Sequence, residues 1–227
     1  MQEKCVVAID GPAGAGKSTV AKILAKKMAY IYIDTGAMYR AITWKCLQFA
    51  GELTKEKVEE IAQSTKIRFV VTDKGVNSVW ADADDVTEAI RTPEVTARVS
   101  EISSNAVVRE VLSQQQREMG MNGGVVMDGR DIGTCIFPNA KYKIFLTASV
   151  QERAQRRCKE LIEKGYKCNI QELEAEISAR DYADSHREIA PLTKAKDAIL
   201  VDSSALNIEE TVDLLYSICT GKEHEAI

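Results

Sequence analysis

Residues 11–19 read Gly11-Pro-Ala-Gly-Ala-Gly-Lys17-Ser18-Thr19 and match G-x-x-x-x-G-K-[ST], the pattern of a phosphate-binding loop. A β-branched run at residues 5–9 precedes the loop, as expected of a buried strand. Apolar side chains recur after it at helical spacing, at Val20, Ile23, Leu24 and Met28. A strand, a glycine-rich loop and a helix are the context that the pattern requires, so we expect a nucleoside triphosphate to bind here.

The residue types of this loop suit phosphate. Glycines let the backbone turn tightly, so that several N–H groups point at one anion, and the helix beginning near Gly16 adds its positive dipole end. Lys17 is expected to reach the β- and γ-phosphates of ATP, and the Ser18 hydroxyl to ligate Mg²⁺. The residues expected to hold ATP are Gly11, Pro12, Ala13, Gly14, Ala15, Gly16, Lys17, Ser18 and Thr19.

The composition of the 227 residues, with 45% hydrophobic and 28% charged, is that of an ordinary globular protein. A formal net charge of −4 argues against a broad nucleic-acid surface. No apolar run reaches membrane-spanning length and no signal-peptide pattern occurs, so we expect a cytoplasmic protein. As a separate prediction, we expect the protein to be a monomer. No C-x-x-C pair occurs, and we expect free thiols at all the cysteines, which are Cys5, Cys46, Cys135, Cys158, Cys168 and Cys219.

Five apolar runs, with helical stretches between most of them, predict an α/β fold with a five-stranded parallel sheet flanked by helices. They lie at residues 6–9, 31–33, 125–127, 142–146 and 198–201. The first three lead into polar turns, Asp10-Gly11, Asp34-Thr35-Gly36 and Asp128-Gly-Arg-Asp131. Because ligands bind outside the carboxyl ends of such strands, we expect the three turns to line one edge.

The second and third runs are separated by more residues than one crossover helix needs. Short strands are predicted at 67–71 and 77–80, around Asp73-Lys74-Gly75, among helices near 37–50, 54–63, 93–103 and 106–119. Two arginine-rich helical stretches meet near residues 164–166. We therefore expect a core at 1–36, 120–150 and 188–227, an inserted subdomain at 37–119, and a second mobile element at 151–187.

Phosphate loops serve switches, motors, transporters and small-molecule kinases. The D-x-x-G and N-K-x-D patterns of GTPase switches and the L-S-G-G-Q pattern of transporters do not occur. Phosphoryl transfer needs positive charge near the reacting oxygens, and guanidinium groups bind phosphate in bidentate fashion. The chain has isolated arginines in the expected places, at Arg40, Arg130, Arg153, Arg156, Arg157, Arg180 and Arg187.

The spacing of Arg180, Asp184 and Arg187 predicts one helical stripe with two phosphate or ribose donors, although a solvated salt-bridge ladder has the same pattern. Arg40 follows its strand by one turn and can point back to it, or can lie on the surface. Asp128 is expected to hold Mg²⁺ through water, with Arg130 beside it facing the acceptor. The alternative for that segment is a simple acidic turn.

The chain resembles the bacterial cytidylate kinases, a family of nucleoside monophosphate kinases, from about residue 4 to residue 219. The stretches that carry the resemblance lie at residues 9–18, 34–41, 90–95, 128–134, 137–138, 143–146 and 180–192; the most specific are Asp34-Thr-Gly-Ala-Met-Tyr-Arg40 and Asp128-Gly-Arg-Asp-Ile-Gly-Thr134. The resemblance implies a P-loop kinase core, with residues 37–119 as a nucleoside-monophosphate-binding subdomain enlarged by an insert and residues 151–187 as a short lid. It also implies transfer of the ATP γ-phosphate to CMP or dCMP.

The resemblance also implies a role for each site residue. By this analogy Arg40, Arg130 and Arg187 hold the acceptor phosphate, while Arg180 and Asp184 address the sugar. Thr35 also belongs to the acceptor site, and Ser100, Arg109 and Asp131 read the base. Lys17, Arg130, Arg153 and Arg157 are the expected catalytic residues, the last two as lid arginines over the transferring phosphoryl group.

The base-reading set suits cytosine chemically. Asp131 and Ser100 can accept from the exocyclic amino group, while Arg109 donates to the ring acceptors. Uracil would face Asp131 as acceptor against acceptor, which predicts weak phosphorylation of UMP. Without the resemblance, Ser100 and Arg109 could be ordinary helix surface. Two other functions stay open from the residues: a kinase for another small acceptor, and a nucleotide-dependent switch without turnover.

Overall fold

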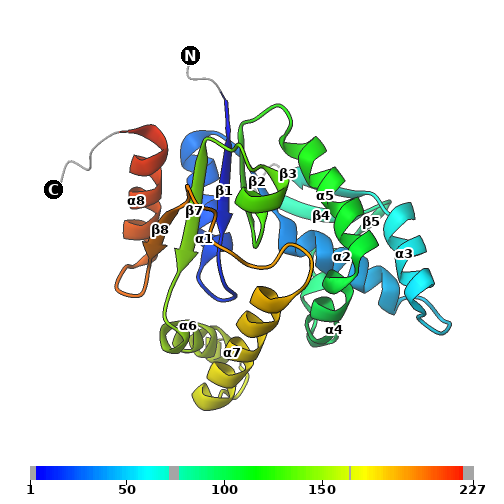
Figure 1. Ribbon diagram of the computed structural model, residues 1–227. Coiled ribbons are helices and arrows are strands. Elements are labelled where there is room, and N and C mark those ends of the chain that lie inside the picture. Colours follow the sequence, from blue (N-terminus) through cyan, green and yellow to red (C-terminus); the bar gives the residue numbers. More distant parts are fainter. Residues whose placement is uncertain (1–3, 72–76, 164, 222–227) are drawn as a thin grey trace. The chain divides into compact units, whose positions relative to one another are not determined.

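The computed structural model describes residues 4–71, 77–163 and 165–221 (Figure 1). The chain divides into two compact units, Met1–Tyr32 with Asn122–Ile227, and Ile33–Met121. Within the described residues, no helix combines the length and apolar character needed to cross a membrane.

The predicted five-stranded sheet is confirmed, in the order β2-β6-β1-β7-β8 (Figure 1). These strands are β1 (Val6–Asp10), β2 (Ile31–Asp34), β6 (Val125–Gly129), β7 (Tyr142–Thr147) and β8 (Ile199–Asp202). The pairs β1–β6, β1–β7 and β7–β8 are parallel. Every residue of β1 and of β6 is buried, as continuous apolar runs in a covered parallel sheet should be. The polar turns after β1 and β6 consequently emerge at one edge of this unit.

Helices α1 (Lys17–Met28) and α8 (Ile208–Thr220) pack on each other and against the sheet. Their buried face includes Val20, Leu24, Val212 and Leu215, in one core with the central strands. Ile23, which the spacing assigned to this face, is 42% exposed because it lies to the side of the stripe formed by 20, 21, 24 and 25. An Asn207–Glu210 capping box begins α8.

Helices α6 (Val150–Glu163) and α7 (Ile170–His186) contact each other beyond the carboxyl ends of β1 and β7 (Figure 1). The expectation of free thiols throughout is wrong for one pair: Cys158 on α6 is joined to Cys168, just before α7, by a disulfide. Their Cα atoms are 5.5 Å apart because the chain turns back between the helices, a proximity that a search for C-x-x-C cannot detect. The free cysteines are Cys46 and Cys219, which are buried, and Cys5 and Cys135, which are partly exposed.

The second unit combines helices with a small antiparallel sheet, in the order β3-β4-β5. Its strands are β3 (Ile67–Val71), β4 (Asn77–Ala81) and β5 (Asp84–Asp85), and its helices are α2 (Thr35–Leu47), α3 (Lys55–Ser64), the short η1 (Ala89–Arg91), α4 (Pro93–Ser104) and α5 (Ala106–Gly120). Met38, Ile42, Ile90 and Leu112 are fully buried in its core. The four expected helices match these elements; Asp73-Lys74-Gly75, predicted between the strands, lies outside the described residues.

Candidate functional site

The loop after β1 has the backbone that its glycines predict. Gly14 and Gly16 have φ of 76° and 82°, in the left-handed region that favours glycine. At Gly11 a Cβ atom would lie 1.9 Å from the carbonyl oxygen of Leu146, so no larger residue fits between the loop and β7. The close approach of the loop to the sheet therefore depends on glycine at this position.

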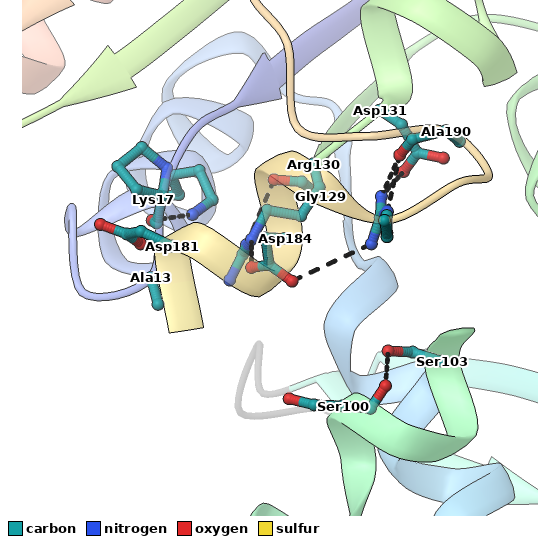
Figure 2. A network of polar contacts seen from close by, with 12 residues as sticks. Ala13, Lys17, Ser100, Ser103, Gly129, Arg130, Asp131, Asp181, Asp184 and Ala190 are labelled. Atoms are coloured by element: carbon teal, nitrogen blue, oxygen red, sulfur yellow. Dashed lines mark hydrogen bonds and ion pairs between the residues drawn. The ribbon is translucent and has the colours of Figure 1, made fainter. Parts of the chain in front are cut away.

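Lys17, the first residue of α1, is buried under this loop. Its ammonium group donates to the carbonyl oxygen of Pro12 at 2.6 Å (Figure 2). Burial, reinforced by the charge of Arg130, lowers the pKa of Lys17 to about 7, although Asp128 and Asp10 act in the opposite direction. The site thus holds a cation whose charge is costly without an anionic ligand.

Ser18 and Asp128 lie together, as the sequence predicts for a cation site. The Ser18 hydroxyl donates to Asp128 Oδ2 at 2.9 Å, and the Tyr32 hydroxyl donates to Asp128 Oδ1 at 2.9 Å. Hydroxyl and carboxylate oxygens suit Mg²⁺. Tyr32 was missed by the sequence reasoning, because a tyrosine inside a strand run reads as packing and its partner is 96 residues away.

A network of arginines and aspartates joins the turn after β6 to the end of α7 (Figure 2). Arg130 Nε donates to Asp184 Oδ2 at 2.8 Å. Arg187 lies 4.0 Å from Asp184 Oδ1 and 3.8 Å from Asp131 Oδ1, and its Nε donates to the Ala190 carbonyl oxygen at 2.7 Å. Burial tends to raise the pKa of Asp184, but the charge and hydrogen bond of Arg130 hold it below its ordinary value.

The predicted stripe lies in the last turns of α7 and at its C-terminal end. Helix α7 ends at His186, and Arg187 follows it in an extended conformation, with φ −65° and ψ 145°. The chain turns at Ala190, with φ 49°, ahead of Pro191. Arg187 is thus the C-cap residue of α7, three positions after Asp184, and the chain leaves the helical path only after it. The network itself argues against an exposed salt-bridge ladder, because the Arg187 and Asp184 side chains are only 11% and 14% exposed.

Arg180 is half-buried on α7, and its Nε is a buried donor with no hydrogen-bond partner among the described residues. Burial, with the nearby charge of Arg130, lowers the pKa of Arg180. An unpaired buried donor costs free energy, so a ligand oxygen here would be favoured.

The two arginines that were predicted to lie over the phosphoryl group differ in position. Arg153 is buried and binds protein groups with all three nitrogens: it donates to the carbonyls of Ala13 and Ala148 at 2.9 Å each, and pairs with Asp181 at 2.7 Å. Arg157 is exposed and pairs with Glu160 on its own helix. The expected placement of both over a phosphoryl group stays a prediction.

Arg156 was predicted only as one of several arginines suited to phosphoryl transfer, without an individual role, and it lies beside the phosphate loop. Its Nη2 donates to the Ser203 carbonyl at 2.6 Å, and a Cβ atom at Gly16 would lie 3.9 Å from its Nη1. The signal was present in the run Arg153 to Arg157, but the register of a helix does not by itself identify which arginine faces the loop.

The predicted acceptor residues of the second unit are held by local contacts. Arg40 donates to the Thr96 hydroxyl at 2.9 Å, and Thr35 is buried at the start of α2. Arg109 is buried, with its guanidinium 5.3 Å from the centre of the Tyr39 ring, so ordinary helix surface is wrong for this residue. It donates to the Ser103 carbonyl at 3.2 Å. Ser100 is exposed on α4, and its carbonyl accepts from the Ser103 hydroxyl (Figure 2).

Comparisons with known proteins identify the family of this chain. A family model described as cytidylate kinase matches residues 7–220. The cytidylate kinase of Bacillus subtilis (strain 168) is 52% identical over 214 residues, covering 94% of this chain and 95% of the relative. That of Pediococcus pentosaceus is 52% identical over 219 residues, covering 96% of each. A solved structure of shikimate kinase from Bacteroides thetaiotaomicron is similar with a TM-score of 0.48 and 15% identity, covering 95% of this chain and 98% of that one. This chain therefore belongs to the cytidylate kinase family.

Proposed function

We propose that this protein transfers the γ-phosphoryl group of ATP to CMP or dCMP, giving ADP and CDP or dCDP. The observation that carries the proposal is the presence of two groups in a single unit: Lys17, buried at the glycine loop, and the pair Arg130–Asp184 at 2.8 Å, with Arg187 4.0 Å from Asp184. A loop for one phosphorylated ligand and guanidinium groups for a second are the parts that phosphoryl transfer between two nucleotides needs.

The loop residues 11–19 and Lys17 would bind the triphosphate of the donor. Its negative charge would offset the cost of the buried ammonium group, because an anion next to Lys17 favours the protonated form. Ser18 and Asp128 would hold Mg²⁺, since both present oxygen atoms within one hydrogen-bonded pair. Bound there, the ion would neutralise phosphate charge.

The acceptor phosphate would be held by Arg40, Arg130 and Arg187, as the family resemblance implies. Its oxygen is already anionic and needs no strong base, so the residues act by positioning and charge neutralisation. Arg180 would bind the sugar of the acceptor, and its buried Nε, a donor without a hydrogen-bond partner among the described residues, supports this role. Asp184 would keep the arginines in register.

The base would be read by Ser100, Arg109 and Asp131, with Thr35 also in the acceptor site. Arg153 and Arg157, in the proposed lid of residues 151–187, would stabilise the transferring phosphoryl group. The protein would work as a cytoplasmic monomer on small molecules, without nucleic acid, with residues 37–119 as the acceptor-binding subdomain and residues 1–36, 120–150 and 188–227 as the core.

A coupled assay of ADP formation with ATP and a panel of nucleoside monophosphates tests the proposal. Rapid ADP formation with CMP and dCMP alone is the expected result. ADP formation with a different acceptor would identify a kinase of other specificity. Tight nucleotide binding with no acceptor-dependent ADP would identify a switch or binding module instead.

A further inference from the structure

Asp10, the last residue of β1, contacts the segment that follows Asp131. Its Oδ1 accepts from the Ile132 N–H at 2.8 Å and its Oδ2 from the Gly133 N–H at 2.7 Å. All four groups are buried, and Asp10 is only 5% exposed. The two carboxylate oxygens thus accept hydrogen bonds from two consecutive backbone amides that lie more than a hundred residues away in the sequence.

These two amides open η2 (Ile132–Ile136), a single π-helical turn for which Asp131 is the N-cap residue. An aspartate at that position ordinarily accepts a hydrogen bond from the second or third amide of its own helix. Asp131 makes no such cap bond, and Asp10 takes the second amide instead. The Asp131 carboxylate is directed towards Arg187, 3.8 Å away.

The contact between Asp10 and the turn is tight. A Cβ atom at Gly133 would lie 3.3 Å from Asp10 Oδ2 and 3.2 Å from the Lys143 side chain, closer than most real contacts. The N–H groups of Ile132 and Gly133 can therefore shift little relative to β1. The same carboxylate is electrostatically coupled to Lys17 of the phosphate loop.

From this geometry we infer that Asp10 is a positioning residue for nucleobase selection: by capping η2 from the neighbouring strand, it keeps the Asp131 carboxylate out of the turn and directed at the acceptor. The inference rests on the proposed function, in which Asp131 reads cytosine. It assigns Asp10 no contact with either nucleotide.

The test is the ratio of kcat/KM for CMP to that for UMP, because effects on ATP are common to both acceptors and cancel. The variant Asp10→Asn keeps the shape of the side chain but replaces one acceptor oxygen by an NH₂ group. This donor then faces the backbone N–H of Ile132 or Gly133, so η2 must shift. We expect the ratio to fall by about tenfold, and amide hydrogen exchange at Ile132 and Gly133 to accelerate. Gly133→Ala should have the same effect, because its added methyl group would lie 3.3 Å from Asp10 Oδ2 and disturb the same hydrogen bonds.

Asp197→Asn is the matched control. Asp197 accepts a hydrogen bond from Lys143 at 2.7 Å, and the Lys143 side chain lies next to Gly133. Within the described part of the chain, the Ile132 and Gly133 amides donate to Asp10 and not to Asp197. Its variant should keep the wild-type ratio even if it is less stable. Cooperative unfolding shows whether Asp10→Asn is folded. If it is not, the ratio of kcat/KM for CMP to that for UMP is measured instead in Gly133→Ala and in Asp10→Glu, whose carboxylate is moved by one methylene group.

The possible failures are distinguishable. If Asp131→Asn changes the ratio while Asp10→Asn and Gly133→Ala leave it at the wild-type value, Asp10 is only a structural residue and the inference is wrong. A loss of stability in Asp10→Asn with an unchanged ratio leads to the same conclusion. Wild-type protein that fails to phosphorylate CMP would instead overturn the proposed function, and this inference with it.

Discussion

Lys17 combines burial, a hydrogen bond and a charge that its surroundings disfavour. The ammonium group is held at 2.6 Å by a carbonyl of its own loop, and burial lowers its pKa to about 7. Such a group contributes little to the stability of the fold, because its charged form is poorly solvated. Its placement is explained by the phosphate charge that the loop is built to bind.

We expect Lys17→Ala to lower kcat by roughly 100-fold or more, as the loss of a major electrostatic group at the reacting phosphate does. Steady-state kinetics with ATP and CMP measure the effect. Lys22→Ala, at an exposed site on the same helix, should retain the wild-type rate. A near-normal kcat in Lys17→Ala would remove this lysine from the mechanism.

Asp10 gives a pH dependence of known sign. Burial, partly opposed by the two amide hydrogen bonds, raises its pKa from 3.8 to about 6. Between these values the folded protein binds more protons than the unfolded chain, so stability falls as the pH rises. The difference in free energy of unfolding between wild type and Asp10→Asn should fall by up to about 3 kcal/mol over this window and stay level above it. Urea unfolding at several pH values measures the difference; a rise would contradict the assignment.

The residues that the sequence could identify are those whose chemistry is set by local spacing. Glycines at 11, 14 and 16 and the lysine after them follow from what a phosphate loop requires. Asp10, Tyr32 and Arg156 could not be recognised in the same way, because each contacts a residue at least 47 positions away. Their partners are fixed by the order of strands and not by any local pattern.

At the scale of elements, α6 and α7 form a pair that carries most of the arginines of the proposed lid, and a disulfide joins α6 to the segment just before α7. The disulfide Cys158–Cys168 closes a short segment, with a sequence separation of 10. A cross-link of this size restricts the unfolded chain and is worth about 2–3 kcal/mol in the chain-entropy description. Helical stretches on both sides of residues 164–166 were predicted from the sequence, but the bridge was not, because it depends on where the turn between them directs Cys168.

Loss of the Cys158–Cys168 disulfide, by reduction or by Cys158→Ser, should lower the temperature of thermal unfolding. The melting curves are recorded without an oxidant, so that no disulfide forms during heating. Thiol titration of the denatured protein should give four thiols before reduction, at Cys5, Cys46, Cys135 and Cys219, and six afterwards. Cys5→Ser, which leaves the bridge intact, is the control for the melting experiment. Six thiols before reduction would contradict the bridge.

For the whole molecule, the sequence predicted the five-stranded sheet because buried strands and polar turns alternate regularly along the chain. It also predicted extra structure between the second and third strands, where the structure has the unit Ile33–Met121. The convergence of Arg130 and Arg187 on Asp184 could be anticipated only in part, since the end of α7 depends on local capping. That Arg40 acts on the same acceptor phosphate stays a prediction.

The proposed monomer is testable on the intact chain. Light scattering coupled to size-exclusion chromatography should give a mass of 25.1 kDa, independent of protein concentration. Addition of ATP and CMP should leave this mass unchanged, since the proposed reaction needs no second copy. A mass near twice this value would show that the protein self-associates.

The burial of two thiols has a practical consequence. Burial raises the pKa of Cys46 to about 11 and that of Cys219 to about 12, so neither offers appreciable thiolate at neutral pH to an electrophilic dye. With the bridge intact and Cys5 replaced by serine, a maleimide fluorophore would attach at Cys135, inside the turn that Asp10 caps. The natural sequence thus supplies an attachment point for an optical probe four residues from Asp131. A change in its fluorescence on addition of CMP would report on the proposed role of Asp131 in acceptor binding.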